Sequence, residues 1–184
     1  GKILADLDGV MRLCRNFPFR YALHAPSDEY NLPKLAKLAE VIGARVVIFH
    51  NIYWEDEWRD IVETFRATGV RLCVENTYSV HEPLKFMRRY GIGRCLDLEH
   101  LQQECAGVYE EEFIRVIKDA SHIHLTGYIY GSELWHTHIH CSPAHSLYLL
   151  DLLKKVGYSG FVVSEAKESL QTYEEFKKLK DFFL

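Results

Sequence analysis

The sequence predicts an α/β fold, a (β/α) barrel of the TIM type with six recognisable parallel strands. Three observations predict it: six short apolar segments, amphipathic segments between them, and a regular spacing of the strand ends. Near-continuous apolar strands indicate a sheet that is covered on both faces, and such sheets are built from parallel strands joined by helices. A length of 184 residues is typical of one domain, so residues 1–184 are expected to form a single barrel domain.

The expected strands share an apolar run that reaches an ionisable residue at or near its end. They are Tyr21–His24, Val46–His50, Arg71–Glu75, Arg94–Asp97, His122–Leu125 and Phe161–Glu165. The strand ends fall at residues 24, 50, 75, 97, 124 and 165, so the first four steps are 26, 25, 22 and 27 residues long. Repeated βα steps of this length predict a barrel, and the final step of 41 residues leaves room for a long loop.

The segments between these strands carry apolar residues at helical spacing. A glycine just beyond such a stripe is a helix stop signal. The expected stripes are Leu35–Ile42 before Gly43, Trp58–Phe65 before Gly69, Phe113–Ile117, and Leu149–Val156 before Gly157.

The N-terminal segment has two interpretations. Residues 3–10 resemble the phosphatase signature of the haloacid dehalogenase superfamily, but the later lysine and paired acidic motif of that superfamily are not recognisable. Apolar residues such as Leu7, Val10 and Cys14 recur at helical spacing, which favours a helix over residues 2–14.

Composition narrows the possible partners and the compartment. The net charge of −4 gives no sign of the basic surface that grips phosphate backbones, which disfavours nucleic acid as a partner. Five cysteines without a CxxC pair favour reduced thiols and a cytoplasmic protein. The sequence shows no signal peptide and no apolar run of membrane-spanning length, so we expect no membrane insertion.

Ionisable residues close every expected strand, and parallel strands in a barrel bring their carboxyl ends to one mouth. Burying several such groups together is unfavourable unless a cation compensates them. Imidazole nitrogen and carboxylate oxygen together suit Zn, Mn, Fe or Co as a divalent ion. The residues concerned are His24, His50, Glu75, Asp97, His124 and Glu165.

Five short motifs, in this order, resemble the xylose isomerase-like TIM barrel superfamily. This superfamily holds sugar isomerases and epimerases and also endonuclease IV, and the resemblance runs from about residue 15 to about residue 170. The motifs are Tyr-Ala-Leu-His-Ala-Pro (21–26), Val-Ile-Phe-His (47–50), Val-Glu-Asn-Thr (74–77), Cys-Leu-Asp-Leu-Glu-His (95–100) and His-Ile-His-Leu (122–125).

The resemblance implies one set of metal ligands and two catalytic carboxylates. The metal would be held by Glu75, Asp97, His124 and Glu165, the set that epimerases use. Glu75 and Glu165 would also move a proton next to a carbonyl. His100 would contact the substrate or bind a second metal.

The resemblance also implies roles for further histidines. His24 and His50 match additional histidines of the endonuclease IV branch, and in an epimerase we expect them to contact substrate. His138 matches the later loop histidine of that branch as a metal ligand. His136 stands where that branch has an aspartate ligand, and it shares one side of an extended segment with His138.

The sequence departs from both branches. The endonuclease branch has a glycine-containing stretch after the loop histidine, whereas residues 139–144 contain no glycine. The sugar enzymes often have an arginine or lysine near the loop, whereas residues 125–145 contain neither. The expected strands match the third to the eighth of an eight-stranded barrel. An incomplete barrel has open strand edges that favour association, so we expect a homo-oligomer.

The sequence therefore predicts a divalent-metal-dependent sugar or sugar-phosphate isomerase or epimerase that acts on a small carbohydrate. One alternative is an endonuclease IV-like metal phosphodiesterase acting on DNA. A second is a degenerate barrel that keeps its metal without catalysis.

Overall fold

A computed structural model describes residues 6–17, 19–27, 31–77, 79, 81–104 and 110–184. The chain forms two compact units. The N-terminal unit holds Gly1–Glu75 and Pro83–Gly93, and the C-terminal unit holds Asn76–Glu82 and Arg94–Leu184. Six parallel strands alternate with helices along the chain, which confirms the expected α/β fold of an incomplete TIM-type barrel.

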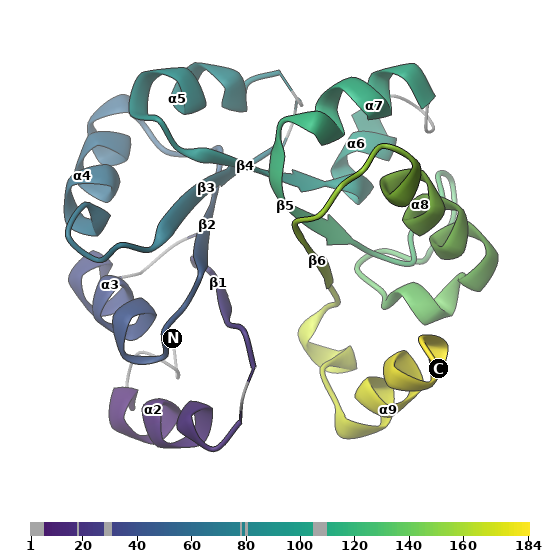
Figure 1. The fold of residues 1–184 in the computed structure, drawn as a ribbon, viewed down its shortest axis with the longest axis horizontal. Coiled ribbons are helices and arrows are strands. Elements are labelled where there is room, and N and C mark those ends of the chain that lie inside the picture. The colour runs from purple at the N-terminus through teal and green to yellow at the C-terminus, as the bar shows by residue number, and fades with distance from the viewer. Residues whose placement is uncertain (1–5, 18, 28–30, 78, 80, 105–109) are drawn as a thin grey trace. The chain divides into compact units, whose positions relative to one another are not determined.

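The N-terminal unit contains three strands and the helices that follow them. Helices α3 and α4 lie next to each other on one side of the strands (Figure 1). In chain order the elements are α2 (Leu7–Arg15), β1 (Ala22–His24), α3 (Leu32–Val41), β2 (Val46–His50), α4 (Glu55–Phe65), β3 (Arg71–Glu75) and α5 (Pro83–Tyr90).

Local signals in the sequence explain where the N-terminal helices begin and end. Helix α3 starts after Asn31, whose side chain accepts a hydrogen bond from the backbone N–H of Lys34. Helix α4 starts after Trp54, whose backbone N–H donates to the Glu57 carboxylate at 2.7 Å. Gly43, beyond α3, has a φ of 64°, a left-handed conformation in which a side chain would be strained.

The parallel register of the N-terminal strands brings their carboxyl ends together. His24 on β1 pairs with Ile48 on β2, and His50 at the end of β2 pairs with Glu75 at the end of β3. The three ionisable strand ends of this unit therefore lie at the same edge of the sheet.

An aromatic group forms the centre of the N-terminal core. Trp58 is fully buried, and its ring lies 6.2 Å from that of Phe49, 6.0 Å from that of Tyr53 and 5.1 Å from that of Phe86. These rings come from β2, α4, α5 and the loop after β2, so one cluster joins the strands to the helices.

The C-terminal unit repeats the same strand–helix pattern. Two short 3₁₀ helices, η1 and η2, interrupt its loops. The elements are β4 (Gly93–Asp97), α6 (Leu98–Glu104), α7 (Glu110–Lys118), β5 (Ala120–Leu125), η1 (Ile139–Cys141), α8 (Pro143–Lys155), β6 (Phe161–Ser164), η2 (Glu168–Leu170) and α9 (Tyr173–Phe182).

Alternation along β4 and β5 separates core residues from site residues. Leu96 pairs with Ile123, and both are fully buried in a cluster with apolar residues of α6, α7 and α8. Asp97 pairs with His124 on the opposite side of the same two strands. On β6, Val163 pairs with His124.

The expected helices are found close to their expected positions. The helix expected over residues 2–14 is observed as Leu7–Arg15, while residues 2–5 lie outside the described part of the chain. The stripe ending at Ile117 lies in α7, and the stripe ending at Val156 lies in α8, which stops before Gly157. In the part of the chain that the structure describes, no helix is long and apolar enough to cross a membrane.

Replacing Trp58 by alanine is expected to lower the free energy of unfolding by about 3–5 kcal/mol, because it leaves a cavity among the surrounding aromatic rings. Trp54→Ala is the matched control, since that side chain is 79% exposed and its loss should change stability by less than about 0.5 kcal/mol. Urea denaturation followed by circular dichroism measures both. Equal losses in the two variants would contradict this description of the core.

Candidate functional site

The carboxyl ends of β4, β5 and β6 bring three possible metal ligands together in the C-terminal unit. Asp97 ends β4, His124 is the penultimate residue of β5, and Glu165 follows β6. The backbone N–H of Glu165 donates to the carbonyl of Leu125 at 3.1 Å, which holds Glu165 beside the end of β5. Parallel pairing thus places one imidazole between two carboxylates.

The distances among these side chains are short. His124 Nδ1 lies 2.9 Å from Glu165 Oε2 and 3.9 Å from Asp97 Oδ2. One ligand atom from each of the three residues lies within 4.8 Å of the others. The Asp97 side chain is 0% exposed and that of His124 is 4% exposed, whereas that of Glu165 is 31% exposed. Glu165 is therefore the member of the group that is most accessible from solvent.

The buried amide of Asn76 fixes the position of Asp97. Asn76 Nδ2 donates to the Asp97 carbonyl at 3.0 Å, and Asn76 Oδ1 accepts from the Asp97 backbone N–H at 2.8 Å. Asp97 Oδ1 in turn accepts from the backbone N–H of His100 at 2.7 Å. Three hydrogen bonds hold the Asp97 backbone and one carboxylate oxygen, and they leave Oδ2 on the side of His124.

Asn76 also orients the imidazole of His100. His100 Nδ1 lies 2.8 Å from the carbonyl oxygen of Asn76 and 3.8 Å from Asp97 Oδ1. Because a carbonyl oxygen only accepts, Nδ1 carries the hydrogen, and Nε2 is the nitrogen left to bind an ion or a substrate hydroxyl.

The loop after β5 places His136 against a buried carboxylate. Glu99 is 0% exposed; its Oε2 accepts from Thr126 Oγ1 at 2.7 Å and from the His136 backbone N–H at 3.0 Å. His136 Nδ1 lies 3.6 Å from Glu99 Oε1, and its ring lies 6.3 Å from that of His100. His136 has a φ of 43°, a strained conformation for a residue with a side chain. These contacts bring His136 next to His100.

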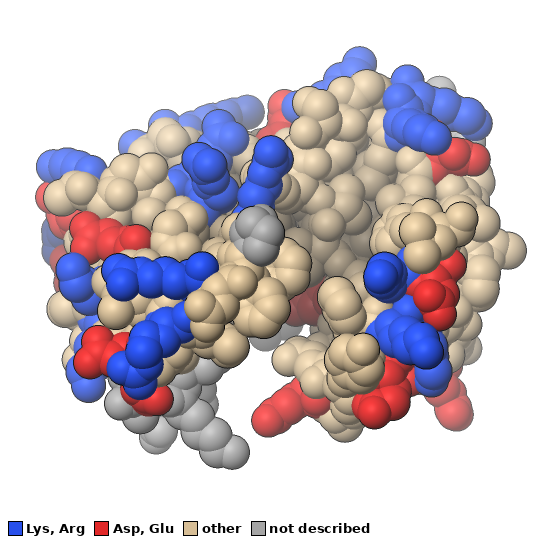
Figure 2. All heavy atoms as spheres, turned by 60° about the horizontal axis from the view of Figure 1, so that its bottom comes forward, with Lys and Arg blue, Asp and Glu red and all other residues tan. Residues whose placement is uncertain are grey.

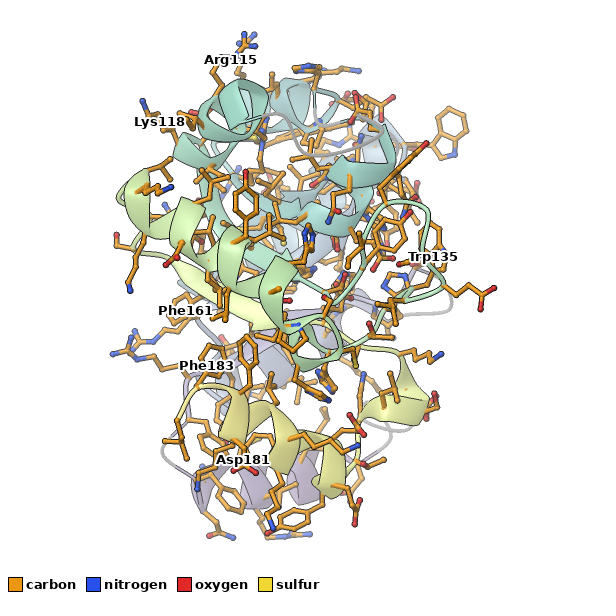
Figure 3. The ribbon with its side chains drawn as sticks, turned by 90° about the vertical axis from the view of Figure 1, so that its right-hand side faces the viewer. Arg115, Lys118, Trp135, Phe161, Asp181 and Phe183 are labelled. Atoms are coloured by element: carbon orange, nitrogen blue, oxygen red, sulfur yellow. The ribbon has the colours of Figure 1, made fainter. Side chains whose placement is uncertain are left out.

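His138, on the same loop, has a hydrogen-bond partner at each ring nitrogen. His138 Nδ1 lies 3.1 Å from Ser164 Oγ, and His138 Nε2 lies 3.1 Å from the Leu170 carbonyl. Since both ring nitrogens have hydrogen-bond partners in this conformation, metal binding by His138 stays a prediction. Trp135 is on the opposite side of the view in Figure 3 from Phe161 at the start of β6.

His24, His50 and Glu75 form a second group in the N-terminal unit. His24 Nε2 lies 2.7 Å and His50 Nε2 lies 3.7 Å from the same atom, Glu75 Oε2. His24 Nδ1 lies 3.0 Å from the Ala25 carbonyl, and His50 Nδ1 lies 3.0 Å from Ser27 Oγ. Because the Ala25 carbonyl only accepts, His24 Nδ1 carries a hydrogen, and the 2.7 Å contact between His24 Nε2 and Glu75 Oε2 needs a proton or a cation shared by these two atoms.

The group at Asp97, His124 and Glu165 fits a divalent metal ion. His124 Nδ1 can carry one hydrogen, yet two carboxylate oxygens face it at 2.9 and 3.9 Å. Two carboxylates this close repel each other unless a cation or a proton lies near them. One imidazole nitrogen and two carboxylate oxygens are a donor set that suits Zn²⁺, Mn²⁺, Fe²⁺ or Co²⁺.

Sequence reasoning singled out the ends of the strands but missed residues that support them. Glu99 lies beside His100 in the sequence, but its role depends on a loop that returns from β5. The sequence does contain a pattern that includes Cys95 and His122, because each lies two residues before an expected ligand and hence on the same side of its strand.

Comparisons with known proteins identify similar solved structures. A xylose isomerase domain protein from Planctomyces limnophilus is 12% identical, with a TM-score of 0.69 over 98% of this chain and 81% of that chain. A D-tagatose 3-epimerase-like protein is 18% identical, with a TM-score of 0.63 over 97% of this chain and 82% of that chain. A D-psicose 3-epimerase, solved in the presence of D-fructose, is 14% identical, with a TM-score of 0.58 over 96% and 74%.

These similarities establish the fold. The chain shares the fold of these solved structures, which is an incomplete (β/α) barrel of the TIM type, as the order of its motifs predicts. No protein-family model and no curated protein sequence matches the chain.

Replacing Asn76 by alanine is expected to lower the free energy of unfolding by about 1–3 kcal/mol, because the buried N–H and carbonyl of Asp97 lose their partners. Asn16→Ala is the control, because Asn16 is exposed at the end of α2 and its loss should stay within about 0.5 kcal/mol. Urea denaturation of the metal-free proteins compares them, and similar stability of the two variants would show that the amide does not hold Asp97.

Proposed function

We propose that this protein is a divalent-metal-dependent isomerase or epimerase of a sugar or sugar phosphate. The observation that carries the proposal is the group of Asp97, His124 and Glu165, whose ligand atoms lie within 4.8 Å of one another at the carboxyl ends of parallel strands. The fold shared with a D-tagatose 3-epimerase-like protein and a D-psicose 3-epimerase supports a small carbohydrate as the substrate.

Epimerisation beside a carbonyl removes a proton from one carbon and returns a proton to the other face of that carbon. The metal ion, when bound, polarises the carbonyl and hydroxyl oxygens of the sugar and so acidifies this carbon. Glu165 is suited to accept the proton because its side chain is 31% exposed while one of its oxygens stays against His124.

A second carboxylate is needed to return the proton from the opposite face, and Glu75 is the residue that we assign to this role. The resemblance of Val-Glu-Asn-Thr (74–77) to the xylose isomerase-like superfamily also implies Glu75 as a metal ligand. His24 and His50, whose ring nitrogens lie 2.7 and 3.7 Å from Glu75 Oε2, would orient that carboxylate and contact sugar hydroxyls. His100 would offer Nε2 to the substrate.

The direct test loads the protein with metal and then surveys candidate sugar substrates. The purified protein is loaded with Mn²⁺, Co²⁺ or Zn²⁺, and ketohexoses and their phosphates are incubated with it in deuterated water. We expect exchange of the hydrogen beside the carbonyl, followed by formation of the epimer, and loss of both after treatment with a chelator.

Glu165→Gln and Glu75→Gln are each expected to lower kcat by about 100-fold to 10,000-fold, the usual contribution of a positioned acid or base. Glu168→Gln is the matched control, because Glu168 is an exposed glutamate on η2 only three residues away. Turnover in the two site variants equal to that of the control would refute the assignment. A chain that binds metal but neither exchanges substrate hydrogen nor cleaves DNA would instead be the degenerate barrel.

A second candidate function is a metal phosphodiesterase, and the His24, His50 and Glu75 group favours it. Three ligands in the N-terminal unit are suited to further metal ions, and clustered ions can activate water for attack on phosphate. The charge of the protein disfavours DNA as a substrate, because the net charge is −4 and the face shown in Figure 2 carries acidic as well as basic side chains. Two or three metals per chain, with cleavage of DNA at abasic sites, would favour this function over the epimerase.

We further propose that the chain forms a homo-oligomer. Val162 and Val163 on β6 are each 37% exposed, and Phe176 on α9 and Phe183 are 57% and 62% exposed. Apolar side chains that are exposed in the single chain favour burial against another copy. Light scattering after size-exclusion chromatography should therefore give at least twice the chain mass of 21.5 kDa. A mass equal to one chain at micromolar concentration would overturn this expectation.

A further inference from the structure

A second pair of ligand-type side chains lies one layer deeper on the same two strands. Cys95 precedes Asp97 by two residues on β4, and His122 precedes His124 by two residues on β5. Successive side chains of a strand alternate between its faces, so Cys95 shares a face with Asp97, and His122 shares a face with His124. The register pairs Cys95 with His122 and Asp97 with His124.

The deeper residues are close together and fully enclosed. Cys95 is 0% exposed, His122 is 1% exposed and His124 is 3% exposed. The ring centroids of His122 and His124 are 5.3 Å apart. One ligand atom from each of the three residues lies within 4.8 Å of the others.

We propose that Cys95, His122 and His124 form a binding site for Zn²⁺, distinct in chemistry from the carboxylate group above it. The shared residue is His124, whose Nδ1 faces Glu165 at 2.9 Å while its ring also lies beside His122. The protein would therefore hold a sulfur- and nitrogen-ligated ion in the deeper layer of the C-terminal unit.

The donor set explains why zinc is the expected ion. Zn²⁺ accepts thiolate and imidazole ligands in tetrahedral sites, whereas Mg²⁺ and Mn²⁺ prefer oxygen. Tetrahedral bonds of about 2.0–2.3 Å separate two ligand atoms by roughly 3.3–3.6 Å. The three ligand atoms already lie within 4.8 Å, so small side-chain rotations on fixed strands bring them to an ion.

Cys73 provides a matched comparison within the same chain. It lies on β3 two residues before Glu75 and is 0% exposed, so its depth and strand position resemble those of Cys95. Its register partner on β2 is Ile48, which offers no ligand atom. A buried cysteine at this depth is therefore not sufficient for the site, and the histidine opposite Cys95 makes the difference.

The test uses Co²⁺, which replaces Zn²⁺ and gives a sulfur-to-cobalt charge-transfer band only when a thiolate is bound. We expect this band in the wild-type protein and in Cys73→Ser, and we expect its loss in Cys95→Ser. His122→Gln should weaken zinc binding, measured by competition with a chromophoric chelator, by at least about 10-fold. Asp97→Asn should keep the band, because it alters only the carboxylate group.

A second measurement needs no variant. Zinc is expected to slow the alkylation of Cys95 in the wild-type protein and to leave the alkylation rate of Cys73 unchanged. Mass spectrometry of the labelled peptides measures both rates. Absence of the band in wild type, its persistence in Cys95→Ser, or equal protection of the two cysteines would overturn the proposal. None of these results depends on sugar turnover, so the zinc site and the proposed epimerase can fail separately.

Discussion

The parallel pairing of β4 with β5 determines which side chains can meet in the C-terminal unit. With Asp97 opposite His124, every second residue toward the start of each strand falls on the same face, and the residues between them enter the core beside α6, α7 and α8. A shift of one residue in β4 would exchange the two faces of that strand. It would turn Leu96 toward the ligands and bury Asp97 among apolar side chains.

Hydrogen bonds from outside the strands then fix what the register has brought together. The side chain of Asn76 bonds to both backbone polar groups of Asp97, and its carbonyl orients His100. Glu99, on the helix that follows β4, holds the returning loop through His136. These supports come from segments far apart in sequence, so the ligands are oriented by buried polar groups rather than by the strands alone.

The sequence predicts the fold and the strand-end residues well because both depend on local patterns. Apolar runs identify the strands, glycines such as Gly43 and Gly157 mark helix ends, and parallel strands end at one edge. The pairing of Glu99 with His136 was not predictable, because it depends on the path of the loop after β5. The same holds for His138, whose nitrogens bond to Ser164 and to a carbonyl of η2.

The most direct test of the central claim, a divalent metal at the carboxyl ends of β4, β5 and β6, is anomalous diffraction from crystals of the manganese-loaded protein. Data recorded at the manganese absorption edge should show a peak about 2.0–2.3 Å from a nitrogen of His124 and from carboxylate oxygens of Asp97 and Glu165. A manganese peak elsewhere, or no peak in crystals soaked at millimolar manganese, would contradict the account.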